Sequence, residues 1–391
     1  MERLAAQAPA RKLMYVSSWP GITLRELTGS HTGGSLPYPL SSPNRLSFCV
    51  ARSGIYHLFR ALNLKPFDQV LVPDYHSGNE MAAMRAAGAS IVHYPIRRNL
   101  EPDLDALRRL APGARVIYVI HYLGWPQPIE EIRALCREHG SLLVEDCALS
   151  MLSEHQGAPL GTFGDFSIFC LYKTLPVPNG GVLAQNREKL PGLAEVGLED
   201  CPRTAGAGRS AELLLEALRS RFDLAGRTLF GIKRFVGRRM RAAKVRHVPV
   251  GDIGWDVANV NIAMSPISER MIGRLDYTSI RQRRRQNFQQ LHGLLAGRVR
   301  MLRDDLPEGA CPLFFPILVK DKPAAARALQ QRGIGAVEFW NGDDSLARPA
   351  AGPDAPYLRK HVLELPIHQD VSPPQLQYIA AQVRQLEIEP A

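Results

Sequence analysis

The chain has 391 residues and a mass of 43.3 kDa, which is enough for two or three domains with buried cores. Its 45% hydrophobic and 22% charged residues are typical of soluble globular proteins and argue against disorder, collagen-like repeats and coiled coil. Because no run of about 18 apolar residues occurs and the N-terminus lacks a signal-peptide core, we expect a cytoplasmic protein.

The formal net charge of +10 comes mainly from one stretch, residues 219–246. This stretch contains ten basic residues and a single acid, Asp223. Its apolar residues fall on one side of a helical projection, which favours a solvated helix that packs by that side. A peripheral contact of residues 227–246 with anionic lipid or an acidic partner is the alternative. No recognition motif for nucleic acid accompanies the charge, so we expect no nucleic-acid partner.

The cysteines are scattered and show neither the paired spacing of a metal site nor that of a disulfide framework. In a cytosolic chain they are expected to be reduced, mostly buried thiols, and we predict no metal. They are Cys49, Cys136, Cys147, Cys170, Cys201 and Cys311.

Residues 1–45 are rich in Ser, Pro and Gly and predict an irregular lead-in. After them, short apolar runs alternate with amphipathic stretches, a pattern typical of an α/β domain with a largely parallel sheet. The predicted strands are 47–51, 69–73, 90–94, 114–121, 141–146, 165–171 and 181–184, and the predicted helices are 55–62, 79–87, 104–110 and 129–139.

The C-terminal part predicts a smaller α/β unit. Residues 265–295 predict one long helix or two, and residues 312–319, 324–332 and 372–386 suggest a strand, a helix and a closing helix. We therefore divide the chain into a lead-in (1–45), a large domain (46–265) with a basic insertion at about 200–250, and a linking helix with a small domain (266–391).

Seven short segments recur in a fixed order, and each is weak by itself. Together they resemble the DegT/DnrJ/EryC1/StrS family of pyridoxal-phosphate enzymes, best known as sugar aminotransferases, over residues 45–388. The segments are ARSGIYHLFRAL (51–62), VLVPDYHSG (70–78), VIHYLGWP (119–126), LLVEDCALS (142–150), GTFGDFSIFCLYKTLPVPNGG (161–181), NVNIAMSP (259–266) and LELPIHQDVSPPQL (363–376).

The resemblance implies the fold type I architecture of pyridoxal-phosphate transferases. This is an α/β fold with a large domain around a mostly parallel seven-stranded sheet and a smaller C-terminal α/β domain. Its cofactor needs a lysine for the Schiff base, an acid at the pyridine nitrogen, a phosphate cradle and a flat group against the ring.

Lys173 and Asp146 are the candidate catalytic and cofactor-binding residues. Lys173 follows an apolar run and has no other Lys or Arg near it from Gly161 to Gly181, so a desolvated, nucleophilic amine is expected there. Asp146 ends an apolar strand, where a carboxylate needs a cation such as a pyridinium nitrogen. Glu145, on the other face of the strand, is expected to be structural. The family lysine and aspartate match these two positions.

Ser53 and Gly54 are the candidate phosphate-binding residues. They precede a predicted helix, whose first N–H groups bind anions well. Ile55 stands where the family has threonine, which removes one hydroxyl. Cys170 lies three residues before Lys173, where related aminotransferases place a phosphate-binding serine.

His76 is the first candidate for the group that stacks on the ring, with Tyr75 as the alternative. Asn261 matches a family asparagine that reaches the cofactor phosphate of the neighbouring subunit, which implies a homodimer with shared sites. Other positions depart from the family. Leu149 replaces a glutamine that touches the ring hydroxyl, Asn179 replaces a glutamate, and Glu269 replaces a glutamine.

These residues lead to a functional hypothesis. We expect a pyridoxal-phosphate-dependent aminotransferase that moves an amino group from glutamate or glutamine to a nucleotide-linked keto sugar, in surface polysaccharide or related biosynthesis. One alternative keeps the cofactor and takes a lipid-linked or other non-sugar ketone at a membrane surface. Another is a catalytically silent regulatory module with the same fold, because fold alone does not fix function.

Overall fold

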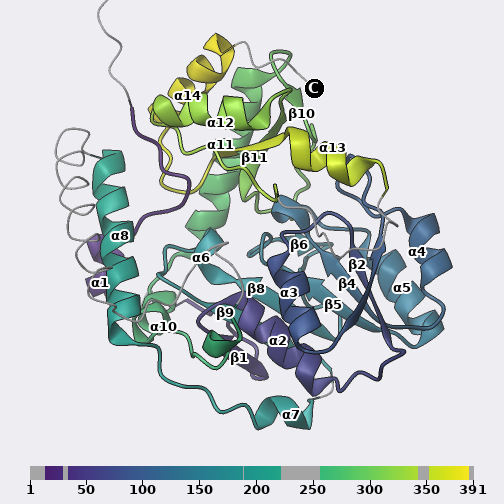
Figure 1. Ribbon diagram of the computed structural model, residues 1–391. Helices are drawn as coiled ribbons and strands as arrows, with labels where there is room; N and C mark the ends of the chain where they lie inside the picture. The colour runs from purple at the N-terminus through teal and green to yellow at the C-terminus, as the bar shows by residue number, and fades with distance from the viewer. Residues whose placement is uncertain (1–13, 30–33, 188, 222–255, 342–351, 387–391) are drawn as a thin grey trace, which may run out of the picture.

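The computed structural model describes residues 14–29, 34–187, 189–221, 256–341 and 352–386. A large seven-stranded sheet occupies the lower part of the molecule in Figure 1, and a smaller three-stranded sheet lies above it. Residues 222–246 of the basic segment, for which a helix was predicted, lie outside the described residues. The domain boundaries at 45/46 and 265/266 stay predictions.

The central sheet has the strand order β1-β9-β8-β5-β4-β2-β3. The pairs from β8 through β5, β4 and β2 to β3 are parallel, whereas β9 is antiparallel to both β1 and β8. The predicted mostly parallel seven-stranded sheet is thus confirmed. Its strands are β1 (Arg45–Phe48), β2 (Gln69–Pro73), β3 (Ser90–Tyr94), β4 (Ala114–Ile120), β5 (Leu142–Asp146), β8 (Phe166–Cys170) and β9 (Gly181–Gln185).

Helices connect and cover these strands. Two of them, α2 and α3, lie side by side in front of the sheet in Figure 1 and both begin near its carboxyl edge. The elements here are α2 (Ala51–Ala61), α3 (Asn79–Ala86), α4 (Leu104–Leu110), η1 (Tyr122–Gly124), α5 (Ile129–His139), the hairpin of β6 (Glu154–His155) and β7 (Ala158–Pro159), α6 (Leu171–Thr174) and α7 (Pro191–Ala194).

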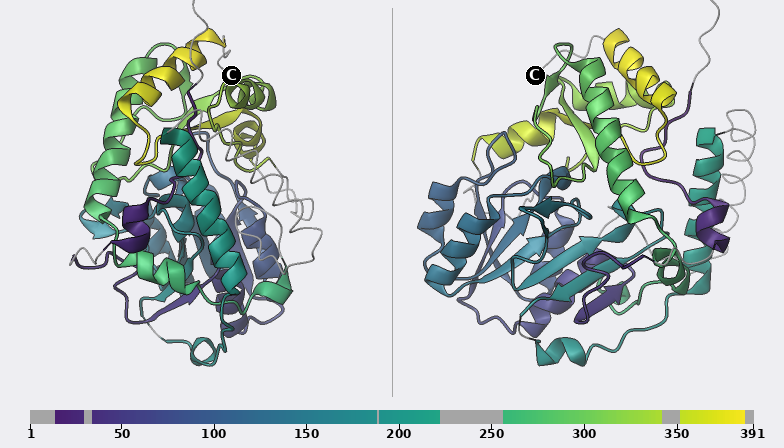
Figure 2. Two further views of the ribbon diagram at one scale, coloured as in Figure 1. Left: turned by 90° about the vertical axis from the view of Figure 1, so that its left-hand side faces the viewer. Right: turned by 180° about the vertical axis from the view of Figure 1, so that it is seen from behind.

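The upper part is built on an antiparallel sheet of order β10-β11-β12. The long helix α11 runs from this part down toward the central sheet (Figure 2). The elements are η2 (Val257–Asn259), α10 (Pro266–Ile272), α11 (Tyr277–Leu295), β10 (Arg300–Met301), β11 (Phe314–Leu318), α12 (Lys322–Gln331), α13 (Asp354–His361), β12 (Val362–Pro366) and α14 (Pro373–Gln385).

The N-terminal segment packs against both parts. Val16 pairs with Gly333 and Gly335 through backbone hydrogen bonds of 2.8 Å. The segment then forms α1 (Leu24–Thr28) beside α8 (Arg203–Arg221), as Figures 1 and 2 show. The contact is close, because a Cβ atom on Gly21 would lie 2.6 Å from the Cβ of Ala217.

The start of one predicted helix differs from the structure, and a second prediction is decided between its two alternatives. The helix predicted at 55–62 begins four residues earlier, at Ala51, after an N-cap residue without a side-chain cap, Val50. Residues 265–295 form two helices, because Gly273 ends α10 and the Asp276 carboxylate accepts a hydrogen bond from the backbone N–H of Ser279 to begin α11.

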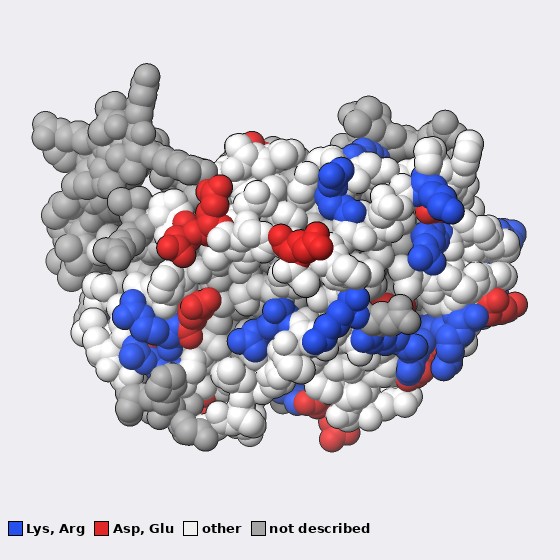
Figure 3. Space-filling view, turned by 90° about the horizontal axis from the view of Figure 1, so that it is seen from below, with Lys and Arg blue, Asp and Glu red and all other residues white. Residues whose placement is uncertain are grey.

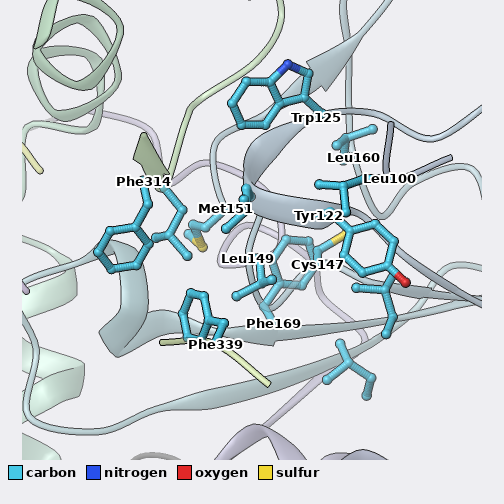
Figure 4. Close-up of a cluster of buried hydrophobic side chains, with 14 of the residues drawn as sticks. Leu100, Tyr122, Trp125, Cys147, Leu149, Met151, Leu160, Phe169, Phe314 and Phe339 are labelled. Carbon is cyan, nitrogen blue, oxygen red and sulfur yellow. The ribbon is translucent and has the colours of Figure 1, made fainter. Parts of the chain in front are cut away.

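The main core joins the two parts. Phe314 and Phe339 from the upper part lie near Leu149 and Met151, which follow β5 (Figure 4), and all four are nearly fully buried. This continuous apolar contact fixes how the small sheet sits above the carboxyl edge of the large one.

The surface of the described residues carries both signs of charge. On the face seen in Figure 3, Lys and Arg side chains are interspersed with Asp and Glu side chains. Among the described helices, none is both long enough and apolar enough to cross a membrane.

Candidate active site

Asp146 and Lys173 reach the same edge of the sheet by adjacent strands. Strands β5 and β8 run parallel, with Asp146 opposite Ile168. Asp146 is the last residue of β5, and α6, which carries Lys173, starts directly after β8. Since the carboxyl ends of parallel strands meet at one edge, the fold brings the two predicted groups together.

Both side chains line one partly open pocket, which holds about 550 Å³ of empty space, part of it open to solvent. The walls come from the starts of α2 and α3, the ends of β4, β5 and β8, and a residue of the small part. The lining residues are Val50, Ala51, Arg52, Ile55, Ser77, Asn79, Glu80, Ile120, Asp146, Ala148, Leu149, Ile168, Cys170, Tyr172, Lys173 and Trp340.

The Asp146 carboxylate is held at both oxygens. Oδ2 accepts a hydrogen bond from the Tyr118 hydroxyl at 2.6 Å, and Oδ1 accepts one from the backbone N–H of Ala148 at 2.8 Å. Burial raises the pKa of Asp146, while these two hydrogen bonds and the charge of Lys173 lower it. A cation at the open side of this carboxylate would therefore favour its ionised form further.

Lys173 is half-buried, and its Nζ lies 5.5 Å from the centre of the Phe339 ring. The next residue, Thr174, is fixed from the small part, because the buried Arg284 guanidinium donates to the Thr174 carbonyl at 3.1 Å. Gln369 Nε2 donates to the same carbonyl at 3.3 Å. The short helix α6 is thus anchored on the side away from the pocket.

The predicted phosphate-binding residues are divided. Cys170 lines the pocket, whereas Ser53 and Gly54 do not. Gly54 faces the sheet, since a Cβ atom there would lie 3.3 Å from the Cβ of Leu183. Because α2 begins at Ala51, its first turn presents Ala51 and Arg52 to the pocket instead.

Neither candidate for ring stacking lines the pocket. His76 is buried and stacks on His93, with ring centres 5.2 Å apart. Tyr75 packs edge-on against Trp340 at 4.7 Å. Asn261 also lies outside this pocket, on the surface. Their assignments stay predictions.

Glu80 and Trp340 are among the pocket residues that were not predicted as site residues. Glu80 accepts hydrogen bonds from the backbone N–H and the hydroxyl of Ser77, and burial and the charge of Asp146 raise its pKa. The [ST]-x-x-[DE] pattern at Ser77–Glu80 was a visible capping signal for this carboxylate. Trp340 comes from the small part, and no local pattern indicates that it reaches the sheet edge.

Glu145 is structural, as the alternation along β5 predicted. Its carboxylate accepts hydrogen bonds from the backbone N–H groups of Gly161 and Gly164 at 2.9 and 2.6 Å. Its Oε2 lies 3.0 Å from His121 Nε2, and His121 Nδ1 accepts from the Gln127 backbone at 3.1 Å. These hydrogen bonds fix Glu145 and His121, which lie close to the buried Cys147.

Residues 42–200 match the profile of the DegT/DnrJ/EryC1/StrS aminotransferase family. A relative from Saccharopolyspora spinosa, dTDP-4-dehydro-2,3,6-trideoxy-D-glucose 4-aminotransferase, is 30% identical over 181 residues, which is 43% of this chain and 45% of the relative. GDP-perosamine synthase from Vibrio cholerae is 30% identical over 132 residues, 33% of this chain and 36% of the relative. The chain thus matches less than half the length of each of these relatives.

Solved structures match over most of the chain. Helicobacter pylori PseC, an aminotransferase involved in the biosynthesis of pseudoaminic acid, has a TM-score of 0.70 at 17% identity and covers 95% of this chain and 98% of its own. The aminotransferase TlmJ from Streptoalloteichus hindustanus has a TM-score of 0.63 at 21% identity, with 88% and 85% covered. At such low identity these likenesses establish the fold, and the predicted fold type I architecture is confirmed.

Proposed function

Because residues 42–200 match the profile of the DegT/DnrJ/EryC1/StrS aminotransferase family, we propose that the chain is a pyridoxal-phosphate-dependent aminotransferase. Its acceptor is a keto sugar, nucleotide-linked as in the dTDP and GDP names of two relatives, and its donor is glutamate or glutamine. The product enters surface polysaccharide or a related biosynthesis. The observation that carries the proposal is that Lys173 and Asp146 line one pocket.

The residues present fit the cofactor. An amine and a carboxylate face one pocket, and the carboxylate keeps hydrogen-bond donors at both oxygens that favour its ionised form. When bound, pyridoxal phosphate supplies an aldehyde and a ring that accepts electrons. Tyr118 is itself buried, so the hydrogen bond that orients Asp146 is shielded from water.

The two residues would hold opposite parts of the cofactor. The Lys173 amine would hold it through its aldehyde, with loss of water, and would carry the proton that moves during amino transfer. The Asp146 carboxylate would hold the proton on the ring nitrogen. Burial raises the pKa of Asp146, and the hydrogen bonds from Tyr118 and Ala148 oppose that rise only in part. The positive charge of the ring nitrogen would supply the remaining stabilisation of the ionised form that this role requires.

The pocket offers fewer hydroxyl groups than the resemblance implies. Ile55 and Cys170 line it where the resemblance implies a threonine and a serine. The phosphate would be held by the backbone N–H groups at the start of α2, where Ala51 and Arg52 line the pocket, and by the Arg52 side chain.

The proposal is tested by covalent trapping. The purified chain is mixed with pyridoxal phosphate, reduced with borohydride and digested, and the labelled peptide is identified by mass spectrometry. We expect the label on Lys173 and its loss in Lys173→Ala. Lys189→Ala, which removes an exposed lysine outside the pocket, is the matched control and should keep the label.

Amino transfer is then measured by half-reactions with glutamate, glutamine and a panel of nucleotide-linked keto sugars. A wild-type chain that is labelled on Lys173 but is not converted by any amino donor would support the silent regulatory alternative. Equal labelling of wild type and Lys173→Ala would refute the assignment of the lysine.

We also propose a homodimer with shared sites. The support is the position of Asn261, whose side chain is exposed and lies outside its own pocket, as a residue that serves a neighbouring subunit requires. Analytical ultracentrifugation tests this, and a monomer at micromolar concentration with full activity would contradict it.

A further inference from the structure

Trp340 adopts an unusual backbone conformation. Its φ angle is +53°, in the left-handed region that bulky residues avoid. Residues held in such conformations concentrate at functional sites, and they persist only where the surrounding structure fixes them. The side chain is 9% exposed, so burial and strain coincide at this residue.

Buried charged groups fix the backbone around it. Lys322 Nζ donates to the Phe339 carbonyl at 2.6 Å, and Glu364 accepts from the Phe339 N–H at 3.3 Å. Arg359 donates to the Trp340 carbonyl at 3.3 Å and to the His76 carbonyl at 2.9 Å. Lys322 and Glu364 are each 1% exposed. Burial of charges is expensive, so two buried charged groups, together with the half-buried Arg359, at two adjacent residues point to a conformation that the protein needs.

The indole ring is held as a wall of the pocket. Tyr75 and Tyr122 pack edge-on against it, with ring centres 4.7 and 5.5 Å away. The same ring lines the pocket that contains Lys173 and Asp146. A rigid aromatic face is therefore available where neither His76 nor Tyr75 supplies one.

The indole N–H is buried and has no hydrogen-bond partner among the described residues. Buried donors are nearly always paired, and an unpaired one costs free energy. Trp125 shows the contrast, because its Nε1 donates to the Asp305 carbonyl at 3.1 Å and its ring lies outside the pocket. A core role explains Trp125 fully but leaves the N–H of Trp340 unexplained.

We propose that Trp340 is a cofactor-contacting residue, whose indole packs against the pyridine ring of pyridoxal phosphate and whose N–H donates to an oxygen substituent of that ring. The inference rests on the proposed function. The residue that stacks on the pyridine ring would then come from the small part of the chain, whereas the sequence predicted His76 for this role.

The test uses pyridoxine 5′-phosphate, which lacks the aldehyde and so binds without reaction with Lys173. Affinity is measured by calorimetry on the full chain, and proximity by the quenching of tryptophan fluorescence. Trp340→Phe keeps a flat ring and removes the N–H, and Trp340→Leu removes both. Trp125→Phe is the matched control.

We expect Kd to rise about three- to tenfold in Trp340→Phe, the value of one neutral hydrogen bond, and about tenfold or more in Trp340→Leu. The fluorescence quenching should fall in both variants and persist in Trp125→Phe. If Trp340→Leu does not fold, Trp340→Phe decides. Unchanged Kd and quenching in Trp340→Phe would overturn the inference, whereas absence of binding to the wild-type chain would overturn the proposed function instead.

Discussion

Replacement of Asp146 by asparagine separates the stability of the empty protein from its affinity for the cofactor. In the empty chain burial raises the pKa of Asp146 from its ordinary 3.8, so the fold favours the protonated carboxyl. The stability that this group contributes is present below that ordinary value and is lost as pH rises through the raised one. At pH 8 Asp146→Asn without ligand should therefore be at least as stable as wild type.

The bound state responds in the opposite direction. The asparagine carries no charge to hold the ring nitrogen protonated, and loss of one member of a buried charge pair costs about 3 kcal/mol at the lower end of the measured range. This corresponds to about 150-fold weaker binding. At a ligand concentration of about 100 times the wild-type Kd, ligand stabilises the wild type by about 2.7 kcal/mol and the variant by only about 0.3 kcal/mol.

Urea unfolding at pH 8 with and without pyridoxine 5′-phosphate measures both effects. Asp74→Asn is the matched control, because Asp74 is buried to 5% exposure against 6% for Asp146 but lies outside the pocket. The control should keep the full ligand-induced stabilisation. If Asp146→Asn keeps it as well, Asp146 does not hold the ring nitrogen and the proposed geometry is wrong.

Three further predictions concern the surroundings of the site. Burial raises the pKa of Asp74 from 3.8 to about 6, so the stability of wild type relative to Asp74→Asn should fall by about 2 kcal/mol between pH 4 and pH 7 in urea titrations, and a flat difference would contradict this. Arg284→Met should lower the free energy of unfolding by about 2–4 kcal/mol, because the Thr174 carbonyl loses its charged donor. It should also reduce borohydride labelling of the chain. A loss of stability below about 0.5 kcal/mol would show that Arg284 does not anchor α6. Gly181→Ala should cost about 1–3 kcal/mol in the same assay, because a Cβ atom would lie 2.3 Å from the Ala51 nitrogen, and an unchanged midpoint would show that the strand can move.

Most strands of the central sheet could be predicted from the sequence. Strands β2 and β3 match the predicted 69–73 and 90–94, because each is a short apolar run bounded by turn residues. The start of α2 could not be predicted, since its N-cap residue Val50 supplies no side-chain cap and Ser53 offers a false one. At the start of α2 the backbone of Ala51 packs closely against Gly181. A tertiary contact of this kind produces no pattern in the local sequence.

The site residues that could be predicted from the sequence are those that lie at or just after the end of a strand. Asp146 and Lys173 follow apolar runs on strands that the fold makes neighbours, so pattern and resemblance agreed on both. Tyr118 and Trp340 were not predicted as partners. Their roles depend on contacts between residues far apart in the sequence. Tyr118 lies within the largely apolar strand β4, so no local pattern distinguishes it as the partner of Asp146.

The contacts that the small part makes near the pocket run largely through backbone carbonyl groups. Arg284, Arg359 and Lys322 all reach backbone carbonyl groups, of Thr174, His76 and Phe339, respectively. A carbonyl is present at every residue, so these anchors constrain the geometry of the pocket without constraining which side chains stand there. The groups proposed for cofactor chemistry lie within the matched residues 42–200, whereas Trp340 lies beyond them. Divergence of the C-terminal part can therefore alter what the pocket recognises while Lys173 and Asp146 stay in place.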